Sequence, residues 1–573
     1  MKLTLISLVA FFITWRTFHV SKEKINSSAD IETNKIKNVI RCSPDWNLIS
    51  KYIESTDIPP MPGAGKYKWN IHTKSDSAQF YFNQGINMYY GFHIIEAMGS
   101  FMKASKFDST NAMIWWAQAL AYGPNINDAA YNASPLALDA IKKTTRLSTN
   151  SSAFEKSLFH AMSIRYSADP SLSREKLNND YTLAMEKIYN HYPKNADAGA
   201  LYADAMMLEH PWELWKNDGT PFPWTPRIRE ALEKTLAQNP EHPGANHYYI
   251  HVMEPSPYPQ KALASADRLG KLNPGLAHLV HMPSHIYLRT GFYKSGYSVN
   301  EEALKQYQSY FNLYPAVAGG EALYRLHNEH MLVNCGMHAG RKKYTIDAAL
   351  ALQNSIDTAL LSDPTGFGNY MQYTYRAPTL MMIRFEDWDG LLNTTETDAK
   401  HVYGNLLLHF GKGMAYCAKN NSADAGKELL SVEMLLKDSC LYLPFTPFSP
   451  AIDGATVAAY LLKGTIALKQ NRTNDAISYF KIAVEREKNM TYNEPRDWLL
   501  NPKNYLAQAY FQSGNYKEAE KVFMQDLNDN NENVWSLRGL YKSLLKQNKK
   551  PAASSVLLRL KKAASASDIN FIN

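Results

Sequence analysis

Seven histidines in the middle of the chain have the spacing of metal ligands on helices. They fall into three groups, within which neighbours stand three or four positions apart: His247 and His251; His278, His281 and His285; His327 and His330. Residues at i, i+3 and i+4 lie on one face of a helix about one turn apart, so two imidazoles can bind one ion while the helix stays intact. Imidazoles favour zinc or copper, whereas magnesium and calcium prefer oxygen ligands. The spacing therefore predicts a transition-metal site.

Seven imidazoles exceed the four ligands of one tetrahedral ion. The set predicts either two ions, with dinuclear copper as the sharpest version, or one zinc or copper ion whose remaining histidines orient ligands or substrate. Glu254 follows His251 by one turn and is the candidate catalytic base, or a further ligand. The alternative is a set of neutral histidines that recognise an anionic or peptide ligand without metal. His338 and His93 are weaker candidates, and a hydrogen bond within a turn is the more typical role for His93.

The elements that must position these side chains are helices. Helical periodicity dominates the sequence, so the expected fold class is all-α. Both ends match the tetratricopeptide repeat (TPR), a 34-residue helical hairpin in which small residues let paired helices approach and an aromatic side chain fills the gap. The matching residues are Gly85, Ala97, Phe101 and Ala104 near the N-terminus, and Gly464, Ala476, Phe480 and Ala483 near the C-terminus. A further repeat carries Ala507, Tyr510, Ala519 and Phe523, and a degenerate last one begins near Trp535.

The same repeat frame predicts where the histidines point. We number the repeats by taking Pro274 as the end of one of them. All three groups of histidines then fall on the first helices of successive hairpins, at positions that face the concave groove. We therefore expect a TPR-type helical-hairpin solenoid, a right-handed superhelix, with a histidine-lined concave groove. The aromatic, proline-rich loop from Pro211 to Trp224 is expected to cover the rim of that groove.

Two histidine motifs carry a resemblance to a known family. The segments His247-Tyr-Tyr-Ile-His251 and His281-Met-Pro-Ser-His285-Ile-Tyr resemble those of a family of bacterial TPR proteins, most of which are predicted to be exported. The resemblance extends from about residue 78 to about residue 345 and includes Tyr90-Gly91-Phe92-His93. It implies the TPR fold and a histidine-rich centre, and it implies no particular reaction.

Length, charge and the N-terminus set further limits. A chain of 573 residues is too long for one compact core, and its 61 basic and 54 acidic residues form no dense basic stripe that would indicate nucleic acid. The apolar stretch from Leu3 to Trp15 predicts a signal peptide or N-terminal anchor within residues 1–20, followed by a linker over 21–66. We expect a histidine-rich, TPR-like N-terminal domain over 67–345 and a C-terminal TPR domain over 346–573.

These features predict an exported protein, either periplasmic or tethered to a membrane and facing outward. Its groove histidines would bind one or two copper or zinc ions, and it would be a redox or hydrolytic metalloenzyme acting on a small molecule. One alternative is a TPR scaffold that binds a peptide or protein in the groove without catalysis, and another is metal storage or delivery. The sequence has no Walker loop, G-x-S-x-G, G-x-G-x-x-G or H-E-x-x-H motif, so NTPases, serine hydrolases, Rossmann enzymes and common metalloproteases lack support.

Overall fold

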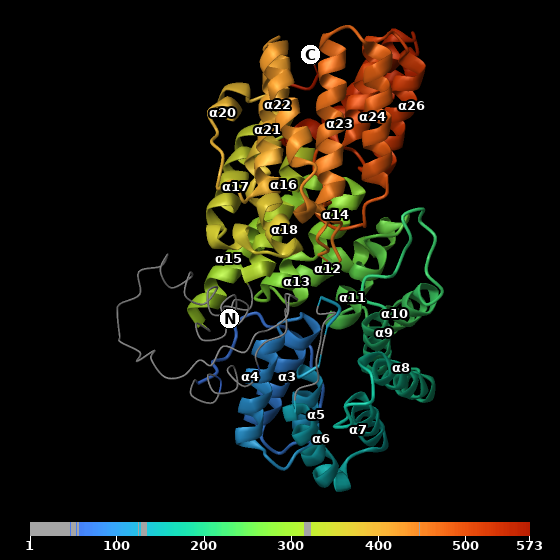
Figure 1. Cartoon of the computed structure of the whole chain (residues 1–573). Helices are drawn as coiled ribbons and strands as arrows, with labels where there is room; N and C mark the ends of the chain where they lie inside the picture. Colours follow the sequence, from blue (N-terminus) through green and yellow to red (C-terminus); the bar gives the residue numbers. More distant parts are fainter. Residues whose placement is uncertain are drawn as a thin grey trace. The chain divides into compact units, whose positions relative to one another are not determined.

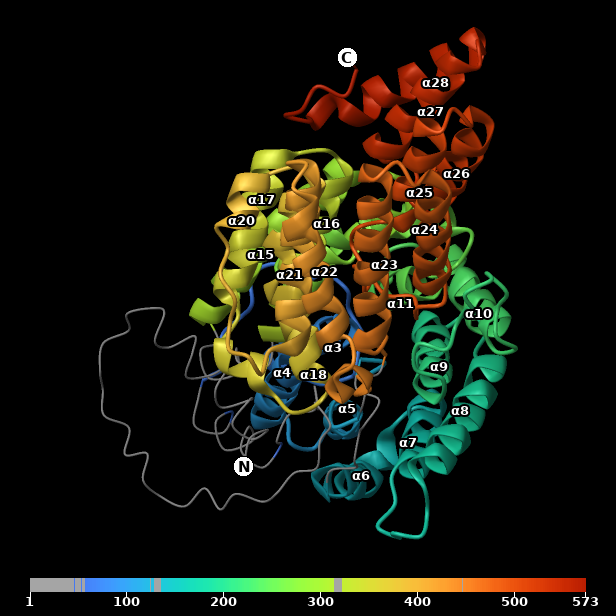
Figure 2. The same cartoon turned by 45° about the horizontal axis from the view of Figure 1, so that its top comes forward.

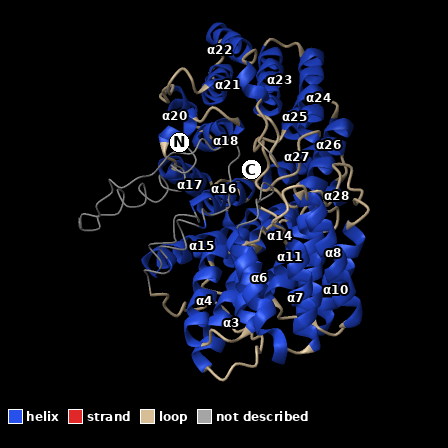
Figure 3. Cartoon of the chain, turned by 60° about the horizontal axis from the view of Figure 1, so that its bottom comes forward, coloured by secondary structure: helices blue, strands red, loops and turns tan. Residues whose placement is uncertain are grey.

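The structure, a computed structural model, describes residues 46, 53, 57–123, 125–127, 135–313, 322–445 and 447–572. Within these residues the regular secondary structure is helical, and extended pairing is limited to two isolated bridges, Trp215 with Pro221 and Phe445 with Phe448 (Figure 1, Figure 3). The all-α prediction is therefore confirmed. The expected signal peptide or anchor lies outside the described residues, as does most of the expected linker.

The chain forms two compact units. Unit 1 comprises Met1–Pro283 and Glu302–Arg325, and unit 2 comprises Ser284–Glu301 and Leu326–Asn573. The sequence predicted a domain boundary at residue 345. The two units instead meet within the chain at α15 (Tyr293–Leu313) and α16 (Ala322–His338), each of which carries residues of both units. Each unit is described below by itself.

Unit 1 is a series of helices joined by short turns, shown from blue to green in Figure 1. Its helices are α3 (Asp76–Tyr90), α4 (Ile94–Phe107), α5 (Ala112–Ala121), α6 (Pro135–Leu147), α7 (Ala153–Arg165), α8 (Arg174–His191), α9 (Ala196–Glu209), α10 (Thr225–Gln238), α11 (Pro243–Met253), α12 (Leu263–Leu272) and α13 (Ala277–His281), with short 3-10 turns η1 (Ser148–Asn150) and η2 (Pro259–Ala262).

The first hairpin, α3 with α4, packs as the repeat pattern predicts. Gly85 on α3 faces the ring of Phe101 on α4, and a Cβ on Gly85 would lie only 2.5 Å from Cε1 of that ring. Ala97, Phe101 and Ala104 are all fully buried. The small residue and the aromatic residue therefore have the complementary roles that their spacing indicates.

Unit 2 continues with longer helical hairpins (Figure 2). After α14 (Pro283–Thr290), α15 and α16, its helices are α17 (Lys342–Ser355), α18 (Gly366–Tyr375), α19 (Ala377–Arg384), α20 (Trp388–Leu392), α21 (Val402–Ala418), α22 (Ser422–Leu435), α23 (Ala451–Lys469), α24 (Thr473–Lys488), α25 (Pro502–Gln512), α26 (Tyr516–Asp529), α27 (Val534–Lys546) and α28 (Lys550–Ala563), with 3-10 turns η4 (Thr358–Ser362), η5 (Ser439–Tyr442) and η6 (Ala564–Ala566).

The glycine and aromatic contact of the first hairpin recurs in unit 2. A Cβ on Gly464 of α23 would overlap the ring of Phe480 of α24, and one on Gly539 of α27 would overlap the ring of Phe523 of α26. By length and composition α23 could also cross a membrane, with a mean hydropathy of 1.3 in its most apolar window. However, 67% of that window is buried within the protein, as expected for the core helix of a hairpin.

Candidate metal centre

The helix that carries the first two predicted ligands, α11, is fixed at its start by His242. Nδ1 of His242 accepts a hydrogen bond from the backbone N–H of Ala245 (3.0 Å), and its Nε2 lies 3.2 Å from Oδ1 of Asp197. Since Nδ1 accepts, the proton of the neutral ring is on Nε2 and is donated to the carboxylate. This N-cap sets the position of α11, on which His247 and His251 stand one turn apart.

Gly244 and Tyr90 determine how closely α11 approaches α3. A Cβ on Gly244 would overlap the ring of Tyr90, so a glycine is needed at this point. The hydroxyl of Tyr90 donates to Oδ1 of Asp197 (2.7 Å), and its backbone carbonyl accepts a hydrogen bond from Nδ1 of His247 (2.7 Å). Tyr90 therefore both supports the first turn of α11 and orients one predicted ligand.

His247 and His251 point their Nε2 atoms at each other across 3.1 Å. A carbonyl oxygen can only accept, so Nδ1 of His247 carries a proton and Nε2 of the neutral ring presents its lone pair. Nδ1 of His251 lies 3.2 Å from Oε1 of Glu254, and an ionised carboxylate likewise holds the proton on that nitrogen. The two facing nitrogens can therefore share a proton or hold a metal ion between them.

His278 on α13 completes a group of three. The ligand nitrogens of His247, His251 and His278 all lie within 4.8 Å of one another. Both ring nitrogens of His278 are buried and have no hydrogen-bond partner in the described part of the chain. Burial, and then the neighbouring His247, hold the pKa of His278 well below its ordinary value of 6.5. The ring is therefore neutral at pH 7, which is the form that binds a metal.

The short helix α13 is held in place from its N-terminal side. The side-chain amide of Asn273 donates to the carbonyl of Ala64 (2.7 Å) and to Oδ1 of Asn87 on α3 (2.9 Å). The backbone N–H of Gly275 donates to the carbonyl of Gly63 (2.8 Å). These contacts tie the start of α13 to α3, so His278 is positioned by the same helix that supports His247.

Two aromatic side chains enclose the three imidazoles. The ring centroid of Phe92 lies 4.4 Å from that of His247, 5.8 Å from that of His251 and 5.9 Å from that of His278. The ring of Trp212, in the aromatic loop, stands edge-on to that of His251 with centroids 5.5 Å apart. Both Phe92 and Trp212 have positive φ, 58° and 64°, which side-chain-bearing residues seldom adopt. Glu386, Asn420, Asn471 and Asn548 have the same backbone conformation at the ends of other helices, so for Phe92 it is a feature of the turn between paired helices.

The three-histidine site is enclosed. The exposed fractions of His247, His251 and His278 are 0%, 2% and 4%, whereas we expected side chains lining an open groove. The difference arises because the α3–α4 turn, which carries Phe92, packs over α11 and α13, and the repeat frame gives no account of that turn. An enclosed site admits only an ion and a small ligand.

The other predicted ligands do not all join this group. His281 is buried in unit 1, with its ring centroid 6.0 Å from that of His278. In unit 2, Nε2 of His285 lies 3.3 Å from Nε2 of His327. Within the described residues, the predicted ligands thus include a group of three in unit 1 and a pair in unit 2.

His330 and His338, also in unit 2, have aromatic neighbours. The ring of His330 stands edge-on to Tyr373 with centroids 6.0 Å apart, and that of His338 stacks on Tyr293 at 5.0 Å. Burial lowers the pKa of His330 to about 4 and that of His338 to about 3. Both rings are therefore neutral core residues at pH 7.

Glu254 has a different position from that of a catalytic base. It is buried, and its Oε1 faces Nδ1 of His251, the nitrogen on the far side of the ring from the facing Nε2 atoms. A carboxylate at this position orients a ligand and raises its basicity. The geometry therefore assigns Glu254 to positioning His251.

Three contributors to the site were not predicted by ligand spacing: the carbonyl of Tyr90, the ring of Phe92 and Trp212 as the particular covering residue. Tyr90 and Phe92 belong to the segment Tyr90-Gly91-Phe92-His93, which stands out in the sequence only as part of the family resemblance. Backbone carbonyls and positive φ at an aromatic residue have no signature in a single sequence.

Comparison with known proteins supports the repeat. A tetratricopeptide repeat model matches residues 505–525. Among solved structures, the chain is similar to the human IFIT1 dimer with m7Gppp-AAAA (12% identity, TM-score 0.30, covering 86% of this chain and 91% of that chain), the APC/C hetero-tetramer Cut9-Hcn1 (12%, 0.28, 83% and 78%) and yeast Tom70 (11%, 0.27, 85% and 93%). No curated protein matches the chain. The matched segment and the hairpin of α25 and α26 together show that the chain contains a tetratricopeptide repeat.

Proposed function

We propose that the chain is an exported TPR-containing protein that holds one zinc or copper ion between His247, His251 and His278. The observation that supports this most strongly is the 3.1 Å separation of two Nε2 atoms whose outer nitrogens are both engaged, by the carbonyl of Tyr90 and by Glu254. A metal ion satisfies both lone pairs at once. The same ion would also bind a ring nitrogen of His278, which has no hydrogen-bond partner in the described part of the chain.

The geometry fits such an ion closely. Zinc binds imidazole nitrogen at about 2.0–2.1 Å, so two nitrogens on one tetrahedral ion lie about 3.3 Å apart. The separation between the facing nitrogens of His247 and His251 is within a few tenths of an ångström of that value. A nitrogen of His278 lies within 4.8 Å of both and would supply the third ligand.

Three protein ligands leave a fourth position open, which is typical of catalytic sites rather than of structural ones. A bound ion would act there as a Lewis acid, or as a redox centre if it is copper. Phe92 and Trp212 would exclude bulk water and limit the substrate to a small molecule. The protein would therefore be a metalloenzyme with a small, enclosed substrate.

The pair of His285 and His327 supports a second ion, held within unit 2, as a variant of this proposal. The N-terminal apolar stretch supports export, into a compartment where copper chemistry is common.

Metal analysis of protein purified without a histidine tag tests the proposal. We expect about one zinc or copper ion per chain in the wild type, and none in the variant carrying His247→Ala and His251→Ala. The matched control is His160→Ala, because His160 is exposed on α7. If the wild type contains no metal and takes up neither zinc nor copper, the proposal is wrong. Full retention of metal by the double variant would show that other residues bind it.

The tetratricopeptide match in α25 and α26 supports a second function, the binding of a protein or peptide partner by unit 2. Cross-linking in the cells that produce the protein, followed by mass spectrometry, would find such a partner on lysines of α26 to α28. If the scaffold function is the only one, metal-free protein and the double histidine variant will bind that partner as the wild type does, and no metal-dependent activity will exist.

A further inference from the structure

Unit 2 contains a pocket whose lining is largely aromatic. It lies where α18, α21 and α23 run side by side, next to the loop between η5 and α23 (Figure 2). Its aromatic and thioether lining consists of Tyr370, Tyr373, Tyr403, Phe445, Phe448 and Met490. This pocket is independent of the metal centre in unit 1.

The aromatic rings form two continuous walls. Tyr370 packs against Phe448 and Phe445, with ring centroids 4.5 Å and 5.3 Å apart, and these two phenylalanines stack on each other at 5.0 Å. On the other wall, Tyr373 and Tyr403 stack at 6.0 Å. Aromatic faces carry partial negative charge and attract cations that cannot be fully solvated.

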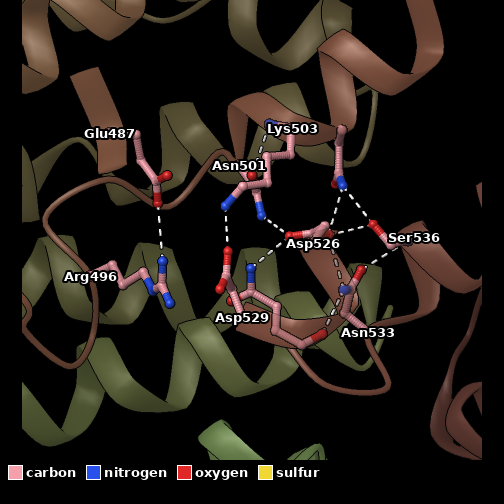
Figure 4. Close-up of polar contacts among 10 residues, drawn as sticks. Glu487, Arg496, Asn501, Lys503, Asp526, Asp529, Asn533 and Ser536 are labelled. Carbon is pink, nitrogen blue, oxygen red and sulfur yellow. Dashed lines mark hydrogen bonds and ion pairs between the residues drawn. The ribbon is translucent and has the colours of Figure 1, made fainter. Parts of the chain in front are cut away.

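A single carboxylate, that of Asp497, lines the pocket. Its Oδ2 accepts a hydrogen bond from the backbone N–H of Ser449 (2.6 Å), and no lysine, arginine or histidine of the described chain forms an ion pair with it. The adjacent Arg496 points to Glu487 instead, with its Nη1 3.1 Å from Oε1, as Figure 4 shows. The nearby carboxyl of Asp453 adds further negative charge, so the pocket lacks a positive partner.

The lining distinguishes between kinds of cation. A primary ammonium group needs about three hydrogen-bond acceptors when it leaves water. Apart from the carboxylate of Asp497, most polar groups of the lining are already engaged. The hydroxyls of Tyr373 and Ser449 accept from the backbone N–H groups of Leu499 and Thr491 (both 2.9 Å), and the amide of Asn369 donates to the carbonyl of Cys440 (2.7 Å). An alkylated ammonium group needs none, since its methyl groups can contact the aromatic faces while its charge is balanced by the carboxylate.

From this combination we infer that the pocket of unit 2 binds a small organic cation with an alkylated ammonium group. Asp497 supplies the opposite charge, and Tyr370, Phe445 and Phe448 supply the aromatic faces. The pocket is therefore a ligand site separate from the metal centre, and a variant that has lost the metal ligands will retain it.

Calorimetric titration of the full-length wild type with choline, tetramethylammonium and 3,3-dimethylbutan-1-ol tests the inference. The last compound is the uncharged isostere of choline, so it measures the apolar contribution alone. We expect choline and tetramethylammonium to bind with one site per chain, and the isostere to bind at least about tenfold more weakly. Equal binding of choline and the isostere, or no binding of any cation, would overturn the inference. This comparison needs no variant and so does not depend on folding.

Variants then assign the site to this pocket. Asp497→Asn preserves the size of the side chain and removes its charge, and we expect it to weaken choline binding about tenfold or more. The matched control is Asp475→Asn, an exposed carboxylate on α24 of the same unit, which should bind choline as the wild type does. Tyr370→Phe retains the aromatic face and should retain binding, whereas Tyr370→Leu should lose most of it. Unchanged binding by Asp497→Asn would place the cation elsewhere and refute the assignment.

The same cationic group occurs free and in phospholipid headgroups, so phosphocholine belongs beside choline in the titration. Tighter binding of choline would identify a free cation as the ligand, and tighter binding of phosphocholine would identify a headgroup. Either result supports the inference, provided that Asp497→Asn weakens the binding.

Discussion

Asp526 in unit 2 and His251 in unit 1 are both buried polar side chains at the centre of a cluster, but their surroundings differ. Asp526 is surrounded by donors that match its two oxygens, as Figure 4 shows. Its Oδ1 accepts from the amides of Asn501 and Asn530, and its Oδ2 from those of Asn504 and Asn533 and from the hydroxyl of Ser536. By contrast, Nε2 of His251 faces Nε2 of His247 at 3.1 Å, and both atoms are of the kind that can bind a metal ion.

This difference separates a structural cluster from a functional one. Burying a polar group costs free energy unless a partner replaces the lost water, and the donors around Asp526 come from the chain itself. The imidazole cluster instead brings together ring nitrogens, which are typical ligands of transition metals. Donors that match a buried carboxylate complete a cluster and stabilise the fold, whereas converging imidazoles favour a metal ion.

The largest expected effect is that of removing the centre of the completed cluster. Asp526→Ala leaves several buried amide donors without an acceptor, so we expect it to lower the free energy of unfolding of unit 2 by about 3–5 kcal/mol. Urea denaturation followed by circular dichroism measures this loss, and the metal content should not change. The control Asp475→Ala should lie within about 0.5 kcal/mol of the wild type. A loss below about 1 kcal/mol for Asp526→Ala would mean that the network contributes little to stability.

The imidazole cluster should respond to metal instead. An ion that binds only the folded protein, at a concentration about 1,000 times its Kd, stabilises it by about 4 kcal/mol. We expect zinc or copper to raise the thermal unfolding temperature of the wild type and of His160→Ala, and to leave that of His251→Ala unchanged. Metal that raises the unfolding temperature of His251→Ala equally would remove the contrast between the two clusters.

An intermediate effect is expected from Gly244→Ala, which alters the support of the imidazoles but none of the ligands. The added methyl group would displace the ring of Tyr90, whose carbonyl orients His247. We expect a loss of about 1–3 kcal/mol in stability and at least about tenfold weaker metal binding, measured by competition with a chelator. The control is Gly426→Ala, because no atom lies within 4 Å of the added Cβ on that exposed face of α22. That variant should gain up to about 1 kcal/mol.

The smallest effect extends the comparison to Asp497, a carboxylate without a cationic partner. Burial raises the pKa of Asp497 to about 7. Hydrogen bonds from the backbone and side chain of Ser449 and from Asn493 oppose this rise, and the carboxylate of Asp453 adds to it. The ring hydroxyls of Tyr370, Tyr373 and Tyr403 also line the pocket and stay neutral in this range. Because a cation prefers the ionised carboxylate, choline affinity should rise about tenfold from pH 6 to pH 8 and then level off.

The effect of Asp497 on stability has the opposite sign. Its pKa is higher in the folded than in the unfolded protein, so its contribution to stability is present at low pH and is lost as pH rises through about 7. Asp497→Asn should therefore be more stable than the wild type at pH 8 when no cation is present. Choline affinity that does not depend on pH between 6 and 8 would show that Asp497 is not the counter-charge.

Helical periodicity and repeat spacing predicted the fold from the sequence because they report local packing. Gly85 with Phe101, and Gly464 with Phe480, are contacts within one hairpin, and their spacing alone indicates them. The boundary of the compact units was not predicted, because α15 and α16 carry residues of both and no linker marks the change.

The sequence predicted that histidines would form the candidate site, but it predicted only partly which histidines would lie together. Helical spacing brings His247 next to His251, because the two stand one turn apart on α11. Whether His278 joins them depends on how the α12–α13 turn is tied to α3 through Asn273, a contact across many residues that spacing does not encode. Spacing also does not encode the position of Phe92, whose ring contacts the imidazoles from a turn where its backbone φ is positive.

The most direct test of the account is the anomalous scattering signal of crystals of the wild-type protein grown with zinc or copper. The account predicts a peak in unit 1, about 2.0–2.1 Å from Nε2 of both His247 and His251, with a nitrogen of His278 as the third ligand. A hydrogen bond between the two Nε2 atoms, with the metal signal elsewhere or missing, would contradict the account.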